Sequence, residues 1–345
     1  MKRHHHHSAL RSVWGATLFR EEDLYHADTT SFATFQASLE NTQIDTPQND
    51  ESFDILRLPA VMNDIYEGRT LPQCSLSYLP SLRELGYTDI EIDSSKVPLP
   101  SDSLFVRGGE IEGRERLDDL VARDLLPNLK LTRNAMMGKD SSSRLSPWIA
   151  HGCLSPRQVA NVCKDTPLIN ELKRRDYFMM RERHFDTKDG VPRVPGKLVA
   201  AWKSGRTGFP IIDACMRELA VTGVLSSRGR KLVASFWIHQ LQLDWRVGAI
   251  YLESALLDCN PSSNWGNWRD LAHSSRTWDI MEESLQWDPD GTYIKRWIPE
   301  LREISGHLLH QPWKLTLSQK ARYAMLLGYP QPIVQNRMGV IHPVR

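Results

Sequence analysis

Residues 258–268 read Asp258-Cys-Asn-Pro-Ser-Ser-Asn-Trp-Gly-Asn-Trp268, which places a carboxylate, carboxamides and two indoles on a predicted turn followed by a helix. Shortly before it come Ser226-Ser-Arg-Gly-Arg230 and Leu243-Asp-Trp-Arg246, which add guanidinium groups and another indole. The chain holds 11 tryptophans, and three of them fall in this neighbourhood. An aromatic-rich helical core explains any one of these indoles. The alternative interpretation is a site for electron transfer, in which the indoles carry the electrons.

Further motifs follow one another along the chain in a fixed order. They read WGATLF at 14–19, TRNAMMG at 132–138, SSRLSPW at 142–148, GCLSPR at 152–157, WKSGRTGFP at 202–210, DACMRE at 213–218, DPDG at 288–291, WIPEL at 297–301 and YPQPIV at 329–334. A short piece such as TGFP carries little information, whereas the shared order and spacing are specific. Over about residues 13–335 the series resembles the FAD-binding domain of the photolyase/cryptochrome family, most closely its DASH branch.

The composition is that of an ordinary soluble protein. Charged residues make up 25% and hydrophobic residues 41% of 345 residues, enough for one large or two small domains. No apolar run approaches membrane-spanning length, so we expect no membrane anchor. Five cysteines without a CxxC pair indicate reduced thiols rather than a disulfide framework. We therefore expect an intracellular protein, with nucleus, cytoplasm and organelle all open.

The charge distribution is more informative than the net charge of +1. Residues 173–206 hold ten Lys or Arg against four Asp or Glu, which predicts a basic face able to hold phosphates. A solvated basic surface is the alternative. His4 to His7 could read as a metal-binding tract, but a cloning remnant or an unstructured start is the preferred interpretation. We expect no metal site.

The hydrophobic pattern predicts helices nearly throughout after residue 110, and no alternating strand run of useful length occurs. Apolar residues recur at helical spacing from Ile211 to Leu219, and Pro210 and Gly223 suit the two ends of that helix. Residues 232–241 and 249–257 predict two more amphipathic helices. The fold class is therefore mainly α, and the resemblance implies the all-helical FAD-binding domain of the photolyase/cryptochrome type.

The resemblance also suggests how the chain is organised. We expect a disordered start at 1–12, a linker with entry helices at 13–105, the helical FAD-binding domain at 106–335 and a tail at 336–345. Residues 41–54 and 91–103 are polar and rich in Pro or Ser, which predicts loops. The N-terminal α/β domain that carries an antenna chromophore in this family is not matched, so we expect neither that domain nor its chromophore.

The resemblance implies FAD as the cofactor. Ser142, Ser143 and Ser146 offer hydroxyls ahead of a predicted helix, and with Arg144 and Leu145 they match the family's phosphate contacts. A helix cap in a flexible loop is the alternative for this run. Other matched cofactor-binding positions are Arg175, Ser227, Arg230, Asp258, Asn260 and Asn264.

Three of these positions carry specific roles in the family. Arg230 and Asp258 match an ion pair against the flavin ring, and Asn264 matches the residue that faces flavin N5. Asn260 stands where a second Asp is usual, although its amide oxygen can still accept a hydrogen bond. Ser227 replaces an Asn, and Leu129 falls near an expected Tyr. Because each lost hydrogen bond is worth about 1 kcal/mol, we expect FAD to bind more weakly than in the family.

Two indoles match the family's electron path to the flavin. Trp268 corresponds to the proximal donor and Trp245 to the middle one, with a purely structural role as the alternative for both. Pro192 and Arg193 stand where the distal indole is expected. We therefore expect slower photoreduction, with Trp265 and Trp278 as the available substitutes.

The surface that would hold damaged DNA departs from the family at two positions. Glu171 matches the carboxylate that contacts the lesion. Arg174 stands where a stacking Trp is usual and Asp270 where an aromatic residue is usual, and we expect Asp270 to repel phosphate. Stacking is worth about 1–3 kcal/mol per base, so the two changes predict a loss in lesion affinity on the order of a hundredfold.

Two functions follow from the resemblance. The first is a deoxyribodipyrimidine photo-lyase, a carbon–carbon lyase that splits cyclobutane pyrimidine dimers in single-stranded DNA by light-driven electron donation from reduced FAD. Its catalytic residues would be Trp268, Trp245 and Glu171. The second is a blue-light photoreceptor or nucleic-acid-binding module with little or no repair. A truncated gene product is a third interpretation. In each case we expect DNA as the partner and a monomeric protein.

Overall fold

Every regular element in the part of the chain that the structure describes is a helix. The computed structural model describes residues 16–44, 106–132, 134–138, 140–164, 166–182, 192–275, 278–322 and 328–334. These belong to the unit formed by residues 1–45 and 103–345. The predicted start at 1–12, the tail at 336–345 and the loop at 91–103 lie outside the described residues. The prediction of a mainly helical fold is confirmed.

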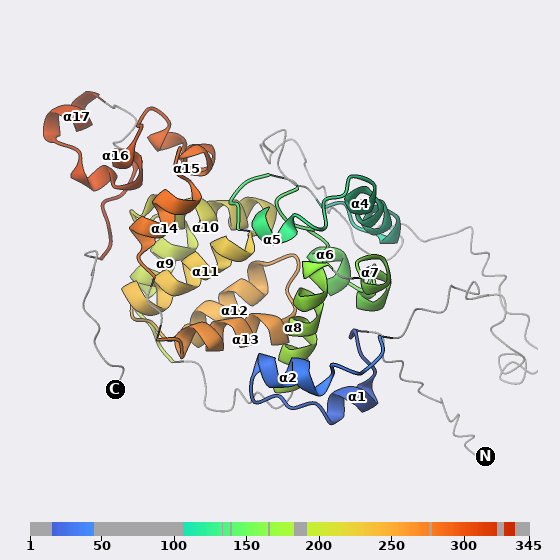
Figure 1. Ribbon diagram of the computed structural model, residues 1–345. Helices are drawn as coiled ribbons and strands as arrows, with labels where there is room; N and C mark the ends of the chain where they lie inside the picture. Colours follow the sequence, from blue (N-terminus) through green and yellow to red (C-terminus); the bar gives the residue numbers. More distant parts are fainter. Residues whose placement is uncertain are drawn as a thin grey trace, which may run out of the picture. The chain divides into compact units, whose positions relative to one another are not determined.

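The helices build two hydrophobic cores, one from the first half of the chain and one from the second (Figure 1). The first core is lined by α1 (Glu21–Tyr25), α2 (Phe32–Ser38), α4 (Glu110–Ala122), α5 (Leu129–Thr132), α6 (Ser146–Ala150), α7 (Pro156–Val162) and α8 (Pro167–Arg181). The second is lined by α9 (Gly196–Lys203), α10 (Pro210–Thr222), α11 (Ser227–Ser235), the π-helix η3 (Phe236–Gln240), α12 (Trp245–Ala255), α13 (Pro261–Ala272), α14 (Ile280–Trp287), α15 (Thr292–Trp297), the 3-10 turn η4 (Pro299–Leu301) and α16 (His307–His310). The 3-10 turn η5 (Pro312–Lys314) and α17 (Leu317–Arg322) follow.

The two cores meet where α8 packs against α13. Gly266 of α13 allows this close approach, because a Cβ at that position would collide with the ring of Phe178 on α8. On its other side α13 packs along α12, so α8, α13 and α12 form the contact region between the halves (Figure 1).

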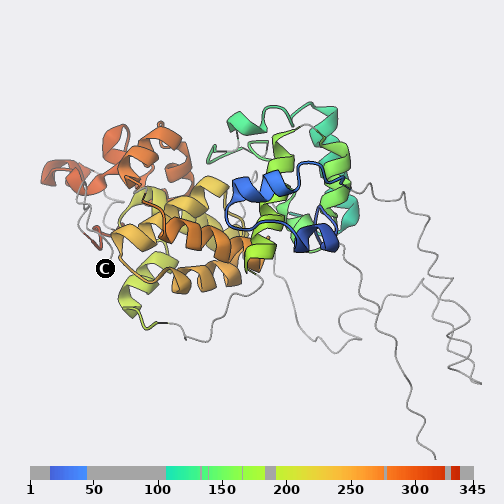
Figure 2. The same ribbon diagram turned by 60° about the horizontal axis from the view of Figure 1, so that its bottom comes forward.

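A buried carboxylate fastens the entry segment to α8. Asp176 is fully buried, and its Oδ2 accepts hydrogen bonds from the backbone N–H groups of Leu18 at 2.8 Å and Phe19 at 3.2 Å. Burial raises the pKa of Asp176 to about 7. The helix α2 also packs on α8, and Figure 2 shows the first helices of the chain beside it. These contacts explain why the entry helices belong to the first core.

Three of the sequence motifs meet at one buried carboxylate, Asp213 of α10. Its Oδ1 accepts from the backbone N–H and the hydroxyl of Thr207, both at 2.7 Å. Its Oδ2 accepts from the N–H of Gly208 at 2.9 Å and from the hydroxyl of Tyr329 at 2.6 Å. The TGFP, DACMRE and YPQPIV motifs therefore serve the fold, since together they satisfy a carboxylate that no solvent reaches.

The three predicted helical segments are present, and two of them have other bounds than predicted. The helix α10 begins at Pro210 and ends before Gly223, whose φ of 67° is left-handed, as the sequence predicted. The stretch 232–241 is not one α-helix, because α11 ends at Ser235 and the chain continues as η3. The third helix, α12, begins four residues earlier than predicted, at Trp245, because the side chain of Asp244 caps it by accepting from the N–H of Arg246 at 2.9 Å.

Candidate functional site

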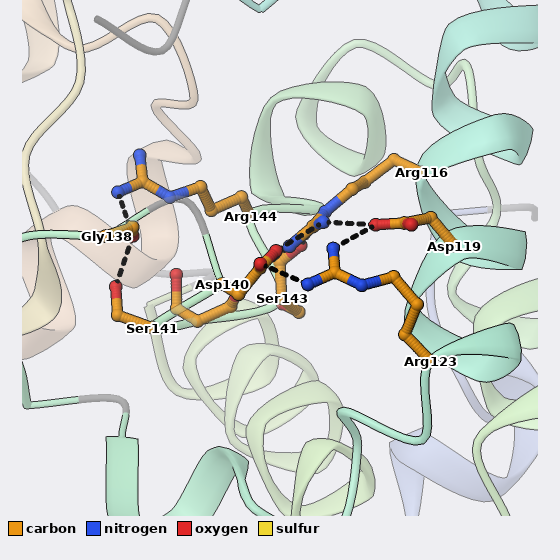
Figure 3. A network of polar contacts seen from close by, with 9 residues as sticks. Arg116, Asp119, Arg123, Gly138, Asp140, Ser141, Ser143 and Arg144 are labelled. Carbon is orange, nitrogen blue, oxygen red and sulfur yellow. Dashed lines mark hydrogen bonds and ion pairs between the residues drawn. The ribbon is translucent and has the colours of Figure 1, made fainter. Parts of the chain in front are cut away.

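The serine loop, the described residues 138 and 140–146 between α5 and α6, is held on α4 by Arg116 and Arg123 (Figure 3). Arg116 donates to the backbone carbonyl of Ser143 at 3.1 Å through Nε and to that of Ser142 at 3.3 Å through Nη2. Arg144 follows with a φ of 57°, a left-handed conformation uncommon for residues other than glycine. Its Nη2 donates to the carbonyl of Gly138 at 3.0 Å. Arg116 and Arg144 therefore hold the loop backbone at the carbonyls of Ser142, Ser143 and Gly138.

The helix that follows this loop does not have the expected serine cap. Leu145 is buried, occupies the cap position of α6 and provides no side-chain hydrogen bond there. Ser146 is exposed and is the first residue of the helix. The alternative interpretation of this run as a serine cap is thus wrong for α6.

The donor set of the serine loop suits an anionic group. Nε of Arg144 is buried and has no hydrogen-bond partner among the described residues. Burial lowers the pKa of the Arg144 guanidinium, and the nearby carboxylate of Glu218 opposes that effect. An unsatisfied buried donor is costly in a folded protein. Together with the neighbouring serine hydroxyls it fits the diphosphate of FAD.

The predicted ion pair is present in the structure. Nη2 of Arg230 on α11 lies 2.8 Å from Oδ1 and 2.7 Å from Oδ2 of Asp258, and Nε of Arg230 donates to the carbonyl of Leu225 at 2.9 Å. The carboxylate is 3% exposed and the guanidinium side chain 32%. An ion pair of this kind adds little stability by itself, and its place against the flavin ring stays a prediction.

The two asparagines of the motif are fixed by α13 and α12. Oδ1 of Asn260 caps α13 by accepting from the N–H of Ser263 at 3.0 Å. Nδ2 of Asn264 donates to the carbonyl of Ala249 at 2.9 Å. The Asn260 oxygen therefore already has one donor, although an amide oxygen can accept a second. Asn264 keeps its amide oxygen and one N–H for a ligand.

His151, at the end of α6, was not anticipated from the sequence. Its Nε2 lies 2.8 Å from the backbone carbonyl oxygen of Leu257. Since a carbonyl only accepts, this Nε2 carries the hydrogen. The bond joins the helix after the serine loop to the segment that presents Asp258. No local sequence signal reveals it, because the two residues are 106 positions apart.

Trp245, Trp265 and Trp268 lie on the α12–α13 pair. Trp268 is 3% exposed, and its ring lies so close to Gly248 of α12 that a Cβ there would collide with it. The ring of Trp245 contacts that of Trp265 edge-on, with 5.6 Å between centroids. Nε1 of Trp265 donates to Oε2 of Glu253 at 2.5 Å. The predicted proximal and middle indoles are thus brought to one helix pair, together with one predicted substitute.

The other predicted substitute belongs to a different cluster. The guanidinium of Arg228 lies 5.0 Å from the ring centroid of Trp278 and 4.2 Å from that of Trp287. Its Nη1 pairs with Glu283 at 3.1 Å, and Nε1 of Trp287 donates to the same carboxylate at 2.8 Å. Trp278 therefore packs on a buried cation, which gives it a structural explanation.

The residues of α8 that match the family's lesion and cofactor contacts differ in their exposure and in their partners. Glu171 and Arg174 are exposed, and the guanidinium of Arg174 lies 4.3 Å over the ring centroid of Phe32 on α2. Arg175 instead donates to the carbonyl of Ala16, and burial lowers its pKa. The structure thus gives Arg175 a role in holding the entry segment, and its flavin contact stays a prediction.

The charge of Asp270 is compensated, contrary to expectation. Oδ1 of Asp270 accepts from Nη1 of Arg181 at 2.7 Å, and Arg181 also donates to the carbonyl of Gly266 at 3.1 Å. Because the pair neutralises the carboxylate, Asp270 repels phosphate less than its sequence position indicated. Arg181, which makes this bond, is one of the cations of the predicted basic face. Two others also have partners within the chain: Arg175 donates to the carbonyl of Ala16, and Arg206 donates to the carbonyl of Gly328 at 3.2 Å. That face holds fewer phosphate-binding groups than the sequence count implies.

Ser227 is exposed at the start of α11. No cluster of three metal-ligating side chains occurs within the residues that the structure describes. No described helix combines the length and the apolar character needed to cross a membrane. Four of the five cysteines lie in the described ranges, and all four are free thiols.

The family described as the FAD binding domain of DNA photolyase matches residues 158–340. A Cryptochrome DASH from Gloeobacter violaceus is 35% identical over an alignment of 358 positions, covering 94% of this chain and 68% of that protein. A Cryptochrome DASH from Synechocystis sp. is 39% identical over an alignment of 267 positions, covering 69% of this chain and 55% of that protein.

Solved structures agree with these sequences. The cryptochrome of Synechocystis sp. PCC6803 superposes with a TM-score of 0.72 at 32% identity, covering 93% of this chain and 70% of that one. The archaeal photolyase from Sulfolobus tokodaii, solved with two FAD molecules, gives a TM-score of 0.67 at 25% identity over the same share of this chain. The chain belongs to the photolyase/cryptochrome family, carries its FAD-binding domain and has FAD as its cofactor. It spans 55% to 68% of the two Cryptochrome DASH proteins above.

Proposed function

We propose that this chain uses FAD to split cyclobutane pyrimidine dimers in single-stranded DNA under light. One observation carries the proposal. The helix α13 presents the amide of Asn264 and the buried indole of Trp268 one turn apart, and Asp258, just before this helix, pairs with Arg230 of α11. An electron donor and a polar contact therefore share α13, and the charge pair joins the start of that helix to α11.

Each residue of this arrangement has a defined task. FAD, when bound, supplies light-driven one-electron chemistry. Ser142, Ser143 and Arg144 provide hydroxyl and guanidinium donors for the diphosphate. The Arg230–Asp258 pair provides a fixed dipole for the ring, and Asn264 provides an acceptor whose orientation its bond to Ala249 sets. Preorganised groups of this kind act without reorganisation at the moment of reaction.

The repair step itself requires no net electron. One electron is lent to the dimer, the two carbon–carbon bonds that join the pyrimidines break, both ring double bonds re-form, and the electron returns. The chain must therefore hold the lesion near the flavin in a flipped-out position. Glu171, exposed on α8, supplies a carboxylate that can accept from the pyrimidine edges, and the guanidinium plane of Arg174 supplies a surface for stacking.

The experiment measures dimer splitting directly. The purified chain is loaded with FAD, reduced without oxygen and mixed with ultraviolet-irradiated oligothymidylate in blue light or in the dark. We expect intact thymines to return only in the light, and more slowly with Glu171→Gln. An absence of splitting by a chain shown to hold reduced FAD would contradict the proposal.

A second function is favoured by a different observation. The Asp270–Arg181 pair occupies the position of an aromatic wall, and the plane of Arg174 already lies on Phe32. A chain that binds FAD and DNA with such a surface could act as a blue-light receptor without repair. Flavin photoreduction in the absence of dimer splitting would support this second function.

A further inference from the structure

A ring of four alternating charges joins α4 to the serine loop (Figure 3). Nη1 of Arg116 lies 2.9 Å from Oδ2 of Asp119 and 3.1 Å from Oδ1 of Asp140. Arg123 completes the ring, with Nη1 3.2 Å from Asp119 and Nη2 2.6 Å from Asp140. Hydrogen bonds from Arg123 and Arg116 lower the pKa of Asp140, so its carboxylate stays ionised. Two cations and two anions leave the ring without net charge.

The two arginines of this ring differ in what else they hold. The side chain of Arg116 is 14% exposed and that of Arg123 is 41% exposed. Only Arg116 donates to the loop backbone, through Nε to the carbonyl of Ser143 and through Nη2 to that of Ser142. A planar guanidinium can make these bonds and the two ion pairs at once, whereas an ammonium cannot.

The two bonds from Arg116 fix the backbone directly before Arg144. Arg144 has a left-handed φ of 57°, and such a conformation persists only where its surroundings determine it. With the carbonyls of Ser142 and Ser143 held by Arg116 and that of Gly138 held by Arg144, the backbone at 142–144 has one course. Arg144 lies on it, and its buried Nε has no hydrogen-bond partner among the described residues.

We propose that Arg116 is a positioning residue for the diphosphate of FAD. It acts through the backbone of the serine loop and prearranges the donors of Ser142, Ser143 and Arg144. Its two carboxylate partners keep its own charge away from the ligand, so the contribution is geometric rather than electrostatic. This inference rests on the proposed diphosphate site at the serine loop.

The chain provides a matched control for this proposal. Arg116→Ala and Arg123→Ala each remove one cation from the ring and leave it with the same charge. Only Arg116→Ala removes the two carbonyl bonds. Arg116→Lys restores the charge without the planar donor set.

The test is a titration of FAD into each flavin-free variant, together with hydrogen exchange of the loop amides at 140–146. We expect Arg116→Ala and Arg116→Lys to weaken FAD binding by about tenfold, the value of one net hydrogen bond, and to speed exchange in the loop. Arg123→Ala should change the affinity by less than about threefold. A second ligand, riboflavin, lacks the diphosphate, and its affinity should be the same for every variant.

The outcomes separate the two proposals. If the unmodified chain binds FAD no better than riboflavin, the diphosphate site at the serine loop is wrong. If the unmodified chain prefers FAD but Arg116→Ala and Arg123→Ala weaken it equally, the ring acts through charge and the positioning role is overturned. If Arg116→Ala fails to fold, Arg116→Lys gives the same comparison, and an unchanged FAD affinity for it also overturns the role.

Discussion

The indole of Trp245 lies edge-on against the indole of Trp265, with 5.6 Å between the ring centroids and 75° between the ring planes. Trp268 sits on the same helix pair but packs against Gly248 instead. By its resemblance to the family, the sequence predicted Trp245 as the middle indole of the electron path and Trp265 as a substitute for the missing distal indole. The ring contact makes these two a pair, and the carboxylate of Glu253 is bonded to the indole N–H of Trp265. That carboxylate can accept the indole proton if Trp265 is oxidised.

The first prediction concerns the immediate electron donor. Trp268→Phe should abolish steady-state photoreduction while FAD stays bound, because Trp268 is the buried indole one turn from Asn264. Trp265→Phe should slow photoreduction severalfold without abolishing it. The measurement is the loss of oxidised-flavin absorption under blue light. Trp278→Phe is the control, since that indole packs on Arg228 and should not matter. Photoreduction of Trp268→Phe at the parent rate would assign the role to another residue.

The second prediction tests the packing that positions Trp268. Gly248→Ala should destabilise the fold by about 1–3 kcal/mol, because the added Cβ must displace the Trp268 ring. Photoreduction should slow as well, although the indole itself is unchanged. Gly196→Ala is the control, because no atom lies within 4 Å of the Cβ it adds. Urea unfolding measures the stability. Equal stabilities of the two variants would show that the α12–α13 contact adapts without moving Trp268.

The third prediction is a pH dependence from Glu218. Burial raises the pKa of this carboxyl to about 7, and its bond from the hydroxyl of Tyr293 at 2.6 Å lowers it less. The unfolded chain releases the proton near the ordinary value of 4.5. Stability from this group is therefore present at low pH and falls as pH rises from about 4.5 to about 7, by at most about 3 kcal/mol.

Glu218→Gln isolates this contribution, because an amide does not ionise and its oxygen can still accept from Tyr293. The free energy of unfolding, measured by urea at pH 5 and pH 8 with equal FAD occupancy, should fall less in the variant than in the parent. The parent contains other titrating groups, among them Asp176, but these are common to both chains. If parent and variant lose the same stability between the two pH values, Glu218 is ionised in the folded protein throughout.

The sequence could predict elements whose signals are local. Pro210 and Gly223 mark the ends of α10 because each has a backbone conformation suited to that position. The change from α11 to η3 at Phe236 was missed, since over five residues the periods of an α-helix and a π-helix place apolar side chains on nearly the same face.

The polar contacts of the site could not be predicted from local sequence signals. Arg230 and Asp258 are 28 residues apart and were paired only because the motif resembles a known family. Arg116 and Asp140, Arg181 and Asp270, and His151 and Leu257 had no such precedent in the sequence. A contact between distant residues depends on how helices pack, and no local periodicity encodes it. For that reason the serine loop was anticipated, but Arg116, which holds two of its backbone carbonyls, was not.

The last prediction concerns repair, and it follows from how Arg174 and Asp270 are held. The guanidinium of Arg174 lies 4.3 Å from the ring centroid of Phe32. A Trp at position 174 would therefore pack on that ring. A Tyr at position 270 would release Arg181 from one partner, but Arg181 keeps its bond to the carbonyl of Gly266 and its ion pair with Glu182. The variant Arg174→Trp with Asp270→Tyr should therefore fold.

We expect this double variant to split dimers in single-stranded DNA about a hundredfold faster at limiting substrate, because each stacked base is worth about 1–3 kcal/mol. Affinity for undamaged DNA should change by less than about threefold, since phosphates contact the basic surface whichever residue forms the wall. Arg174→Trp with Asp270→Asn removes the same carboxylate without adding the second ring. If it gains as much as the Tyr variant, released charge rather than stacking limits repair. If neither gains while the parent already repairs efficiently, positions 174 and 270 do not face the lesion, and the departures there cost the enzyme nothing.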